Sequence, residues 1–142
     1  MEILYASEFL FENCQSIWFK IYTQKVIKIR IPKIREFNYK ILHNYLACGK
    51  SLSKFLEISK YCEYCQNIES IKHMLYDCYR VKRIWNNVSS FLKCDITWKT
   101  IVCGFPKYSS STKIDCMNYI ISCIAYSVYK VNNICKSDKK VV

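Results

Sequence analysis

Four potential metal ligands lie in one short stretch of the chain. Cys62 and Cys65 form a Cys-x2-Cys pair, His73 follows after seven residues, and Cys78 follows after four more. A Cys-x2-Cys turn lets two thiolates bind one ion, and three thiolates with one imidazole complete the tetrahedral set of a structural zinc site. Such a site has no open position for water or a substrate. We therefore expect a structural zinc ion at Cys62, Cys65, His73 and Cys78.

The alternative is that these are four unrelated buried side chains in a cysteine-rich chain. Ten cysteines are present, so a Cys-x2-Cys pair alone arises easily by chance, and the compact spacing of all four residues is the stronger indication. Cys116 and Cys123 lie seven residues apart, which places them on one helical face, as core packing would. We expect most of the non-ligand cysteines to be small core residues. These are Cys14, Cys48, Cys94, Cys103, Cys116, Cys123 and Cys135.

Two local elements must meet if the four side chains are to bind one ion. Asn67 can adopt a left-handed conformation and close the turn after the cysteine pair, and Ser70 can cap a short helix that carries His73. On a continuous α-helix His73 and Cys78 would lie about 140° apart, at about 100° per residue. We therefore expect this helix to end near Tyr76, with Cys78 in the turn that follows.

A carboxylate precedes the histidine at a useful distance. Glu69 stands four residues before His73. Carboxylates often orient a ligating imidazole by accepting a hydrogen bond from its second ring nitrogen. We expect Glu69 to hold His73 in this way.

Helices are expected to dominate, because only two glycines and two prolines interrupt the chain. Apolar residues recur at spacings of three and four, which is typical of amphipathic helices. Residues 25–31 alternate at their end and are expected to be extended, Gly49 is expected to cap the helix before it, and residues 95–99 are expected to be a link. The expected helices cover residues 16–22, 33–48, 52–56, 70–76, 79–91 and 112–131.

The fold class follows from these patterns and from composition. Apolar residues make up 51% and aromatic residues 15% of the chain, which excludes a disordered protein. We predict a mainly α fold: a small helical domain organised around a Cys-Cys-His-Cys zinc site, with an additional C-terminal helix. The zinc-binding domain is expected over residues 17–93, and residues 94–142 are expected to be a linker and an amphipathic helix.

The positive charge is concentrated before the cysteine stretch. The net charge is +11, and residues 20–60 contribute +8 of it. This excess could be a solvated surface, but its position beside the expected zinc site and among aromatic residues indicates a polyanionic partner, RNA or DNA. Lysine outnumbers arginine, which favours phosphate contacts over base recognition. The expected nucleic-acid contacts are Lys28, Arg30, Lys33, Arg35, Lys40, Lys50 and Lys54.

The sequence shows no site for catalysis. It has no readable Ser-His-Asp or Cys-His arrangement, no glycine-rich phosphate loop and no close pair of carboxylates. His43 falls opposite the apolar face of its helix and is expected to be a surface or packed histidine. We therefore expect no catalytic residue, no small-molecule substrate and no enzyme.

The N-terminal residues and the longest apolar run bear on location. Met1 to Leu4 lack a basic region and the run around residues 116–129 is too short to span a bilayer. We expect an intracellular chain with reduced thiols and no membrane partner, in either the nucleus or the cytoplasm.

Taken in order, these residues resemble a known family: the zinc-binding domain downstream of the reverse transcriptase in LINE-type (non-LTR) retrotransposon polyproteins. The similarity covers about residues 17–92. The family usually has Gly where this chain has Gln66 and Pro where it has Tyr79, and neither change removes a ligand. The series is Ile31-Pro32-Lys33-Ile34-Arg35-Glu36-Phe37-Asn38-Tyr39-Lys40-Ile41-Leu42-His43-Asn44, Leu52, Cys62, Cys65, Glu69-Ser70, His73-Met74-Leu75, Cys78 and Ile84-Trp85.

The resemblance implies the same four metal ligands and a nucleic-acid role linked to retroelement replication. Its implied partners are RNA or DNA and other parts of a retroelement polyprotein. The chain has no Tyr-x-Asp-Asp stretch and no room for a polymerase palm, so it does not carry out reverse transcription alone. A zinc-stabilised protein-interaction module and an inactive retroelement remnant are the alternative interpretations.

Overall fold

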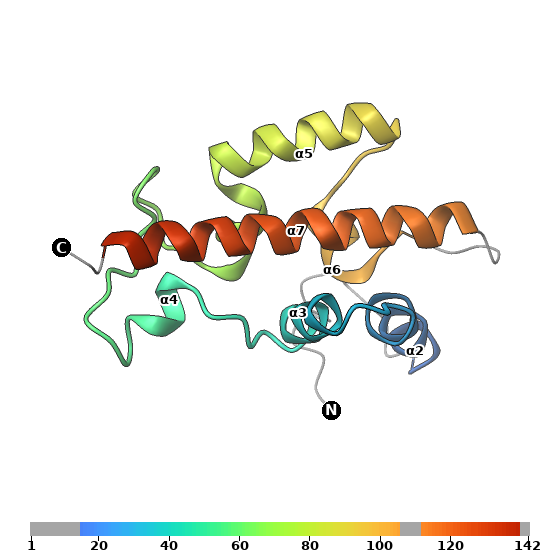
Figure 1. The fold of residues 1–142 in the computed structure, drawn as a ribbon, viewed down its shortest axis with the longest axis horizontal. Coiled ribbons are helices and arrows are strands. Elements are labelled where there is room, and N and C mark those ends of the chain that lie inside the picture. The colour runs from blue at the N-terminus through green and yellow to red at the C-terminus, as the bar shows by residue number, and fades with distance from the viewer. Residues whose placement is uncertain (1–14, 106–111, 140–142) are drawn as a thin grey trace. The chain divides into compact units, whose positions relative to one another are not determined.

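The protein is mainly α-helical in a computed structural model that describes residues 15–105 and 112–139 (Figure 1). Within these ranges β pairing is limited to one isolated bridge, between Tyr61 and Ile68. The predicted fold class, including the C-terminal helix, is confirmed. The elements are α2 (Gln15–Tyr22), the π-helical turn η1 (Thr23–Ile27), α3 (Pro32–Leu42), α4 (Gly49–Leu52), the π-helical turn η2 (His73–Asp77), α5 (Tyr79–Leu92), α6 (Trp98–Cys103) and α7 (Thr112–Lys139).

The chain divides into two compact units. Unit 1 consists of Met1–Tyr45 and Thr97–Ile124, and unit 2 consists of Leu46–Ile96 and Ala125–Val142. The division falls inside α7, whose first half therefore belongs to unit 1. The domain boundary expected at residue 93 stays a prediction.

Helix α3 buries the predicted apolar face but ends earlier than predicted. Its buried side chains include Ile34, Phe37 and Ile41. Asn44 then takes a left-handed conformation with φ of 57°, and the Tyr45 N–H donates to the Lys40 carbonyl at 2.8 Å. This is a Schellman-type ending, in which asparagine can replace glycine. The expectation that Gly49 caps this helix is therefore wrong.

The segment expected to be extended is instead helical as far as Ile27. The extended prediction failed because Lys25 is a core residue, only 1% exposed. Its Nζ donates to Ser122 Oγ at 3.0 Å, and Asn38 Nδ2 donates to the same Oγ at 3.0 Å and to the Lys25 carbonyl at 2.8 Å. Ser122 Oγ donates in turn to the Asn118 carbonyl at 2.8 Å. This network joins η1, α3 and the first half of α7 inside unit 1, and satisfied buried polar groups of this kind make packing specific.

Two short helices differ from the prediction. Helix α4 ends at Leu52, and Phe55 and Leu56 are exposed rather than packed. The expected link near residue 97 contains α6, whose first turn is capped by Thr97 Oγ1 accepting from the Thr100 N–H at 3.3 Å. Trp98, the first residue of α6, is buried. The Thr-x-x-Thr spacing was the available signal, because it permits the reciprocal capping that α6 shows.

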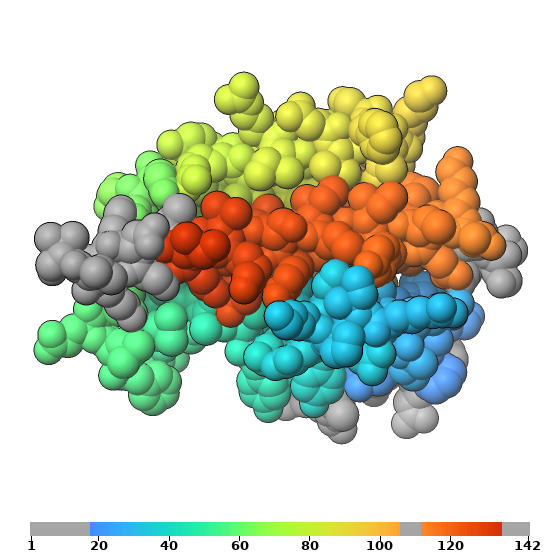
Figure 2. Space-filling model, in the orientation of Figure 1, coloured from blue at the N-terminus to red at the C-terminus, as the bar shows by residue number. Residues whose placement is uncertain are grey.

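Helices α5 and α7 lie close to their predicted ranges. The expected helix over residues 79–91 is confirmed, and Figure 2 shows side chains of α5 at the surface, in yellow. In α7, Cys116 is exposed and Cys123 is half-buried, so the expected core packing of this pair is wrong for Cys116. No helix of the described residues combines the length and apolar character needed to cross a membrane.

Replacement of Lys25 by methionine tests the buried ammonium. Burial lowers the pKa of Lys25 from 10.5 to about 8, against the opposing influence of Cys103. Between these values the unfolded chain binds a proton that the folded chain does not, so wild-type stability rises with pH. The unfolding free energy of wild type minus that of Lys25→Met is expected to increase by roughly 1 kcal/mol from pH 7 to pH 9. Urea titrations at the two pH values measure this difference.

Lys113→Met removes an exposed lysine from unit 1 and is the matched control. The subtraction removes the contribution of thiols that titrate in both proteins. A difference for Lys25→Met that is the same at both pH values would contradict the burial of a titrating ammonium.

Candidate metal centre

The four predicted ligands come together at one place in unit 2. One donor atom from each of Cys62, Cys65, His73 and Cys78 lies within 4.8 Å of every other. Cys65 Sγ is 2.9 Å from His73 Nε2, and Cys62 Sγ is 4.0 Å from Cys78 Sγ. Cys62, His73 and Cys78 are buried and Cys65 is half-buried. This geometry can hold a metal ion with four protein ligands.

A tight turn positions the first two cysteines. The Cys62 N–H donates to the Asn67 carbonyl at 2.6 Å, and the Gln66 N–H donates to the Cys62 carbonyl at 2.9 Å. Gln66 has φ of 61°, a left-handed conformation that glycine adopts more easily. The expectation that Asn67 supplies the left-handed residue is therefore wrong. The left-handed residue lies one position earlier, at Gln66.

A π-helical turn positions the other two ligands. The His73 N–H donates to Ser70 Oγ at 3.1 Å, so the predicted capping serine is confirmed. The Cys78 N–H donates to the His73 carbonyl at 3.0 Å, a bond over five residues rather than four. This wider turn brings His73 and Cys78 closer to one face than the roughly 140° of an α-helix allows. Cys78 itself has left the helix, with ψ of 133°, as predicted.

The adjoining helix is fixed to this turn. Trp85 of α5 is buried, and its Nε1 donates to the Leu75 carbonyl at 2.7 Å. Leu75 is itself fully buried. The bond satisfies a carbonyl that the π-helical turn leaves available, because the helix ends shortly after it. It therefore secures the segment that carries His73.

Glu69 connects the metal turn to α4. It is buried, its Oε1 accepts from the Gly49 N–H at 2.9 Å, and its carbonyl accepts from the Lys50 N–H at 2.9 Å. A Cβ at position 49 would lie 3.1 Å from Glu69 Cβ and 3.2 Å from the Ser59 carbonyl oxygen. Gly49 is thus required for a close approach, which the sequence analysis missed. The expected bond from His73 to Glu69 stays a prediction.

Two thiols of the cluster, those of Cys62 and Cys78, have shifted pKa values. Burial alone raises the pKa of Cys62, but the N–H groups of Tyr64 and Cys65 stabilise its thiolate, and the net pKa is lowered. Burial raises the pKa of Cys78 to about 11, against the N–H of Arg80, and the neighbouring Cys62 and Cys65 thiolates add to the rise. Four close donors, one of them a thiol with a lowered pKa, are suited to bind a cation, and a bound cation favours the thiolate form of its ligands.

The seven predicted nucleic-acid contacts fall in both units. Lys28, Arg30, Lys33, Arg35 and Lys40 belong to unit 1, and Lys50 and Lys54 belong to unit 2. All are exposed except Lys40, which is half-buried.

Three of these side chains also have partners inside the protein. Lys28 Nζ lies 3.5 Å from an Asp115 oxygen, and Lys40 Nζ lies 2.7 Å from Glu36 Oε1. Arg35 donates to the carbonyls of Ile29 at 2.9 Å and Arg30 at 3.3 Å. Arg35 therefore shapes the loop before α3, which its sequence context did not indicate.

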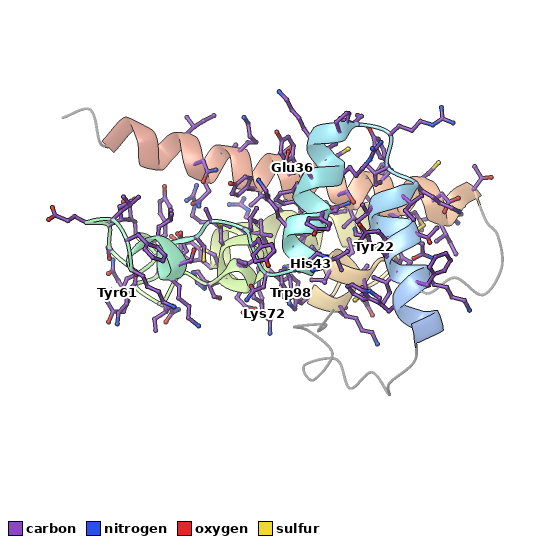
Figure 3. The ribbon with its side chains drawn as sticks, turned by 90° about the horizontal axis from the view of Figure 1, so that it is seen from below. Tyr22, Glu36, His43, Tyr61, Lys72 and Trp98 are labelled. Atoms are coloured by element: carbon purple, nitrogen blue, oxygen red, sulfur yellow. The ribbon has the colours of Figure 1, made fainter. Side chains whose placement is uncertain are left out.

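His43 does not lie on the exposed face of α3. It is buried, with its ring 4.3 Å from that of Tyr39 and 6.2 Å from that of Trp18. Figure 3 shows His43 on the side of α3 that faces α2. The expected surface position is wrong and the packed alternative is correct: His43 still continues the helical hydrogen bonding, with its N–H donating to the Tyr39 carbonyl at 3.1 Å, but neighbouring aromatic rings cover it.

Comparison of the chain with protein-family models, with curated proteins and with solved structures finds no match. The candidate metal centre is therefore supported by the geometry of the chain's own residues.

Ligand variants test the metal centre directly. Wild type is expected to bind one ion per chain, and Cys78→Ser is expected to weaken binding by more than the 10- to 100-fold typical of changes around the ligands. Elemental analysis after dialysis measures the stoichiometry, and competition with a chromophoric chelator measures the affinity. Cys116→Ser removes an exposed thiol outside the cluster and should retain the metal. Equal metal content in the two variants would contradict the assignment.

Proposed function

We propose that the chain is a nucleic-acid-binding module stabilised by a structural zinc ion and derived from a retrotransposon polyprotein. The observation that carries this proposal is the convergence of Cys62, Cys65, His73 and Cys78 within 4.8 Å. The exposed basic side chains of the segment before the cluster supply the proposed contact with RNA or DNA.

Zinc is the ion that the donor set favours. Three thiolates and one imidazole match the ligands of structural zinc sites, and carboxylate-preferring ions such as calcium and magnesium are disfavoured. Zinc–sulfur bonds of about 2.3 Å in a tetrahedron place two sulfurs roughly 3.8 Å apart. The 4.0 Å between the Cys62 and Cys78 sulfurs is close to that separation. All four positions would be filled by protein, so the ion would hold the fold rather than act on a substrate.

The surroundings of the cluster explain why an ion is needed. Around the metal turn, Tyr61, Tyr64 and Ile68 are exposed, so little apolar area is buried there to offset the ordering of the backbone. Structural zinc contributes on the order of 10 kcal/mol of apparent binding free energy. An ion of that strength can hold a turn that its own apolar contacts do not.

The proposed nucleic-acid contact in unit 1 lies in the segment around the start of α3. Arg30, Lys33 and Arg35 are exposed there. Arg35 already donates two hydrogen bonds to backbone carbonyls, so its guanidinium is less available for bidentate hydrogen bonding to a guanine edge. Phosphate contacts, which do not depend on base identity, are therefore the proposed mode.

The resemblance to the reverse-transcriptase zinc-binding domain supports the same conclusion. It rests on the order of the ligands with the Pro-Lys start of α3 and with Trp85, and Trp85 lies against the segment that carries His73. The proposal includes no catalytic activity and no small-molecule substrate. RNA or DNA and other parts of a retroelement polyprotein are the proposed partners.

Metal removal tests the zinc part of the proposal. In the metal-loaded chain, amide hydrogen exchange is expected to be slow in the buried parts of residues 60–80. Chelation should accelerate that exchange, because the proposed ion links the cysteine turn to the segment that carries His73. Amides of α3 should keep their protection, since its apolar side chains pack in the core of unit 1. Unchanged exchange protection of residues 60–80 after chelation would contradict the proposed zinc ion.

A salt titration tests the nucleic-acid part. Wild-type binding to mixed-sequence RNA and DNA should weaken linearly on a plot of log affinity against log salt concentration, because phosphate contacts release counterions. Lys33→Gln should lower the magnitude of that slope by about 1 and weaken binding similarly for all sequences. Fluorescence anisotropy over a range of salt concentrations measures both effects.

Lys113→Gln is the matched control, because it removes an exposed lysine of unit 1 that is not one of the seven predicted contacts. No binding to any nucleic acid at low salt would contradict this function and favour a zinc-stabilised protein-interaction module.

A further inference from the structure

Exposed tyrosines surround the metal turn of unit 2. Tyr61 is 46% exposed, Tyr64 is 41% exposed and Tyr79 is 62% exposed. Tyr61 precedes the ligand Cys62, Tyr64 precedes Cys65, and Tyr79 follows Cys78. Tyrosine rings usually bury much of their apolar area, so three exposed rings beside one buried cluster require an explanation. Tyr61 projects outward from the turn in Figure 3.

The metal cluster brings these tyrosines near one another. The sulfurs of Cys62 and Cys78 are 4.0 Å apart, so the residues bonded to these cysteines, Tyr61 and Tyr79, begin from neighbouring backbone. Tyr64 is connected to the other segment directly, because the Arg80 guanidinium lies 3.6 Å from the centre of its ring. We call Tyr61, Tyr64, Tyr79 and Arg80 the tyrosine surface.

Basic side chains are interleaved with the rings. Besides Arg80 over Tyr64, Lys60 Nζ lies 5.3 Å from the ring centre of Tyr61. Tyr61, Tyr64 and Arg80 stay exposed in these cation–π pairs, so ring and guanidinium area is accessible to a further planar group. The nearby carboxylates moderate the charge: Glu69 is buried, and Glu63 and Asp77 are exposed. The attraction of this surface for phosphate is therefore modest, and its planar faces are its main feature.

Planar faces with a moderate positive charge fit one class of partner best. Aromatic rings and arginine planes bind unpaired bases by stacking, whereas the bases of a duplex are already stacked on each other. An acidic peptide would match the positive charges but would not use the exposed rings as fully. Stacking tolerates any base, which agrees with a module that contacts phosphates without reading sequence.

We propose that the tyrosine surface binds unpaired bases of single-stranded RNA or DNA by stacking. This inference rests on the proposed nucleic-acid function and adds a second contact, separate from the basic segment before the metal turn. Because every tyrosine in it adjoins a ligand of the cluster, the metal-held turns set the positions of the rings. Loss of the metal would disperse the surface even if the basic segment of unit 1 stayed folded.

Alanine substitution of Tyr64 tests the proposal. Binding of the metal-loaded chain to an oligouridine or oligothymidine strand is expected to weaken by about 5- to 150-fold, the range typical of losing one base–aromatic stack. Binding to a duplex of the same length should be unchanged. The salt slope should also be unchanged, because no phosphate contact is removed. Tyr64→Phe keeps the ring and should bind as wild type does.

A control variant separates stacking from general exposure of aromatic residues. Phe91 is 82% exposed at the far end of α5 in the same unit, and Phe91→Ala should not change affinity for the single strand. Metal content is measured for every variant, so that Tyr64→Ala is interpreted only in its metal-loaded form.

The outcomes distinguish this inference from the proposed function. If Lys33→Gln lowers the salt slope while Tyr64→Ala leaves single-strand affinity unchanged, the tyrosine surface is refuted and the basic contact stands. If Tyr64→Ala weakens single strand and duplex equally, stacking on unpaired bases is also refuted. If no nucleic acid binds at low salt, both proposals fail, and the exposed tyrosines belong to a protein-binding surface.

Discussion

The hydrogen bond from the Cys78 N–H to the His73 carbonyl is the constraint on which the candidate metal centre depends. It widens one helical turn to the π form, so that His73 and Cys78 point toward a common site. On a regular α-helix the two side chains would point about 140° apart. The cysteine turn meets this point from the other side. The neighbouring contacts then preserve the arrangement: Trp85 fixes the wide turn, and the Glu69–Gly49 bond fixes the chain that enters it.

The two units are stabilised by different physics. Unit 1 buries apolar faces of α3 and α6 and places a polar network at their centre, in which Lys25 shares the Ser122 hydroxyl with Asn38. A buried ammonium is costly unless its protons are bonded, and the depressed pKa of Lys25 is the sign of that cost. In unit 2 the turns around the cluster expose much of their aromatic surface, so burial of apolar area stabilises them little. The proposed ion would supply the missing stabilisation.

The number of lysine and arginine residues in the sequence overstates the positive charge that is available to a partner. Lys25 is buried, Arg35 holds a loop, and Lys28 and Lys40 have carboxylate partners. The proposed phosphate contact therefore depends on fewer side chains than the segment contains. The tyrosine surface adds a different kind of contact, which charge counting could not find, because the exposure of its rings and the placement of Arg80 over Tyr64 are tertiary facts.

The sequence by itself determined the four residues that come together as a candidate metal site, the mainly helical class, the helix predicted over residues 79–91 and the end of the His73 helix before Cys78. Ligand spacing and apolar period are local properties of the sequence. Tertiary structure decided the rest. Gln66 rather than Asn67 took the left-handed position, and Asn44 rather than Gly49 ended α3. Lys25 and His43 were buried against the polarity of their neighbours in sequence. In each case the local preference of the residue was weak. A contact with a distant segment, or the hydrogen bonds of the closed turn, outweighed it, and the residue pattern alone does not show which of these effects is larger.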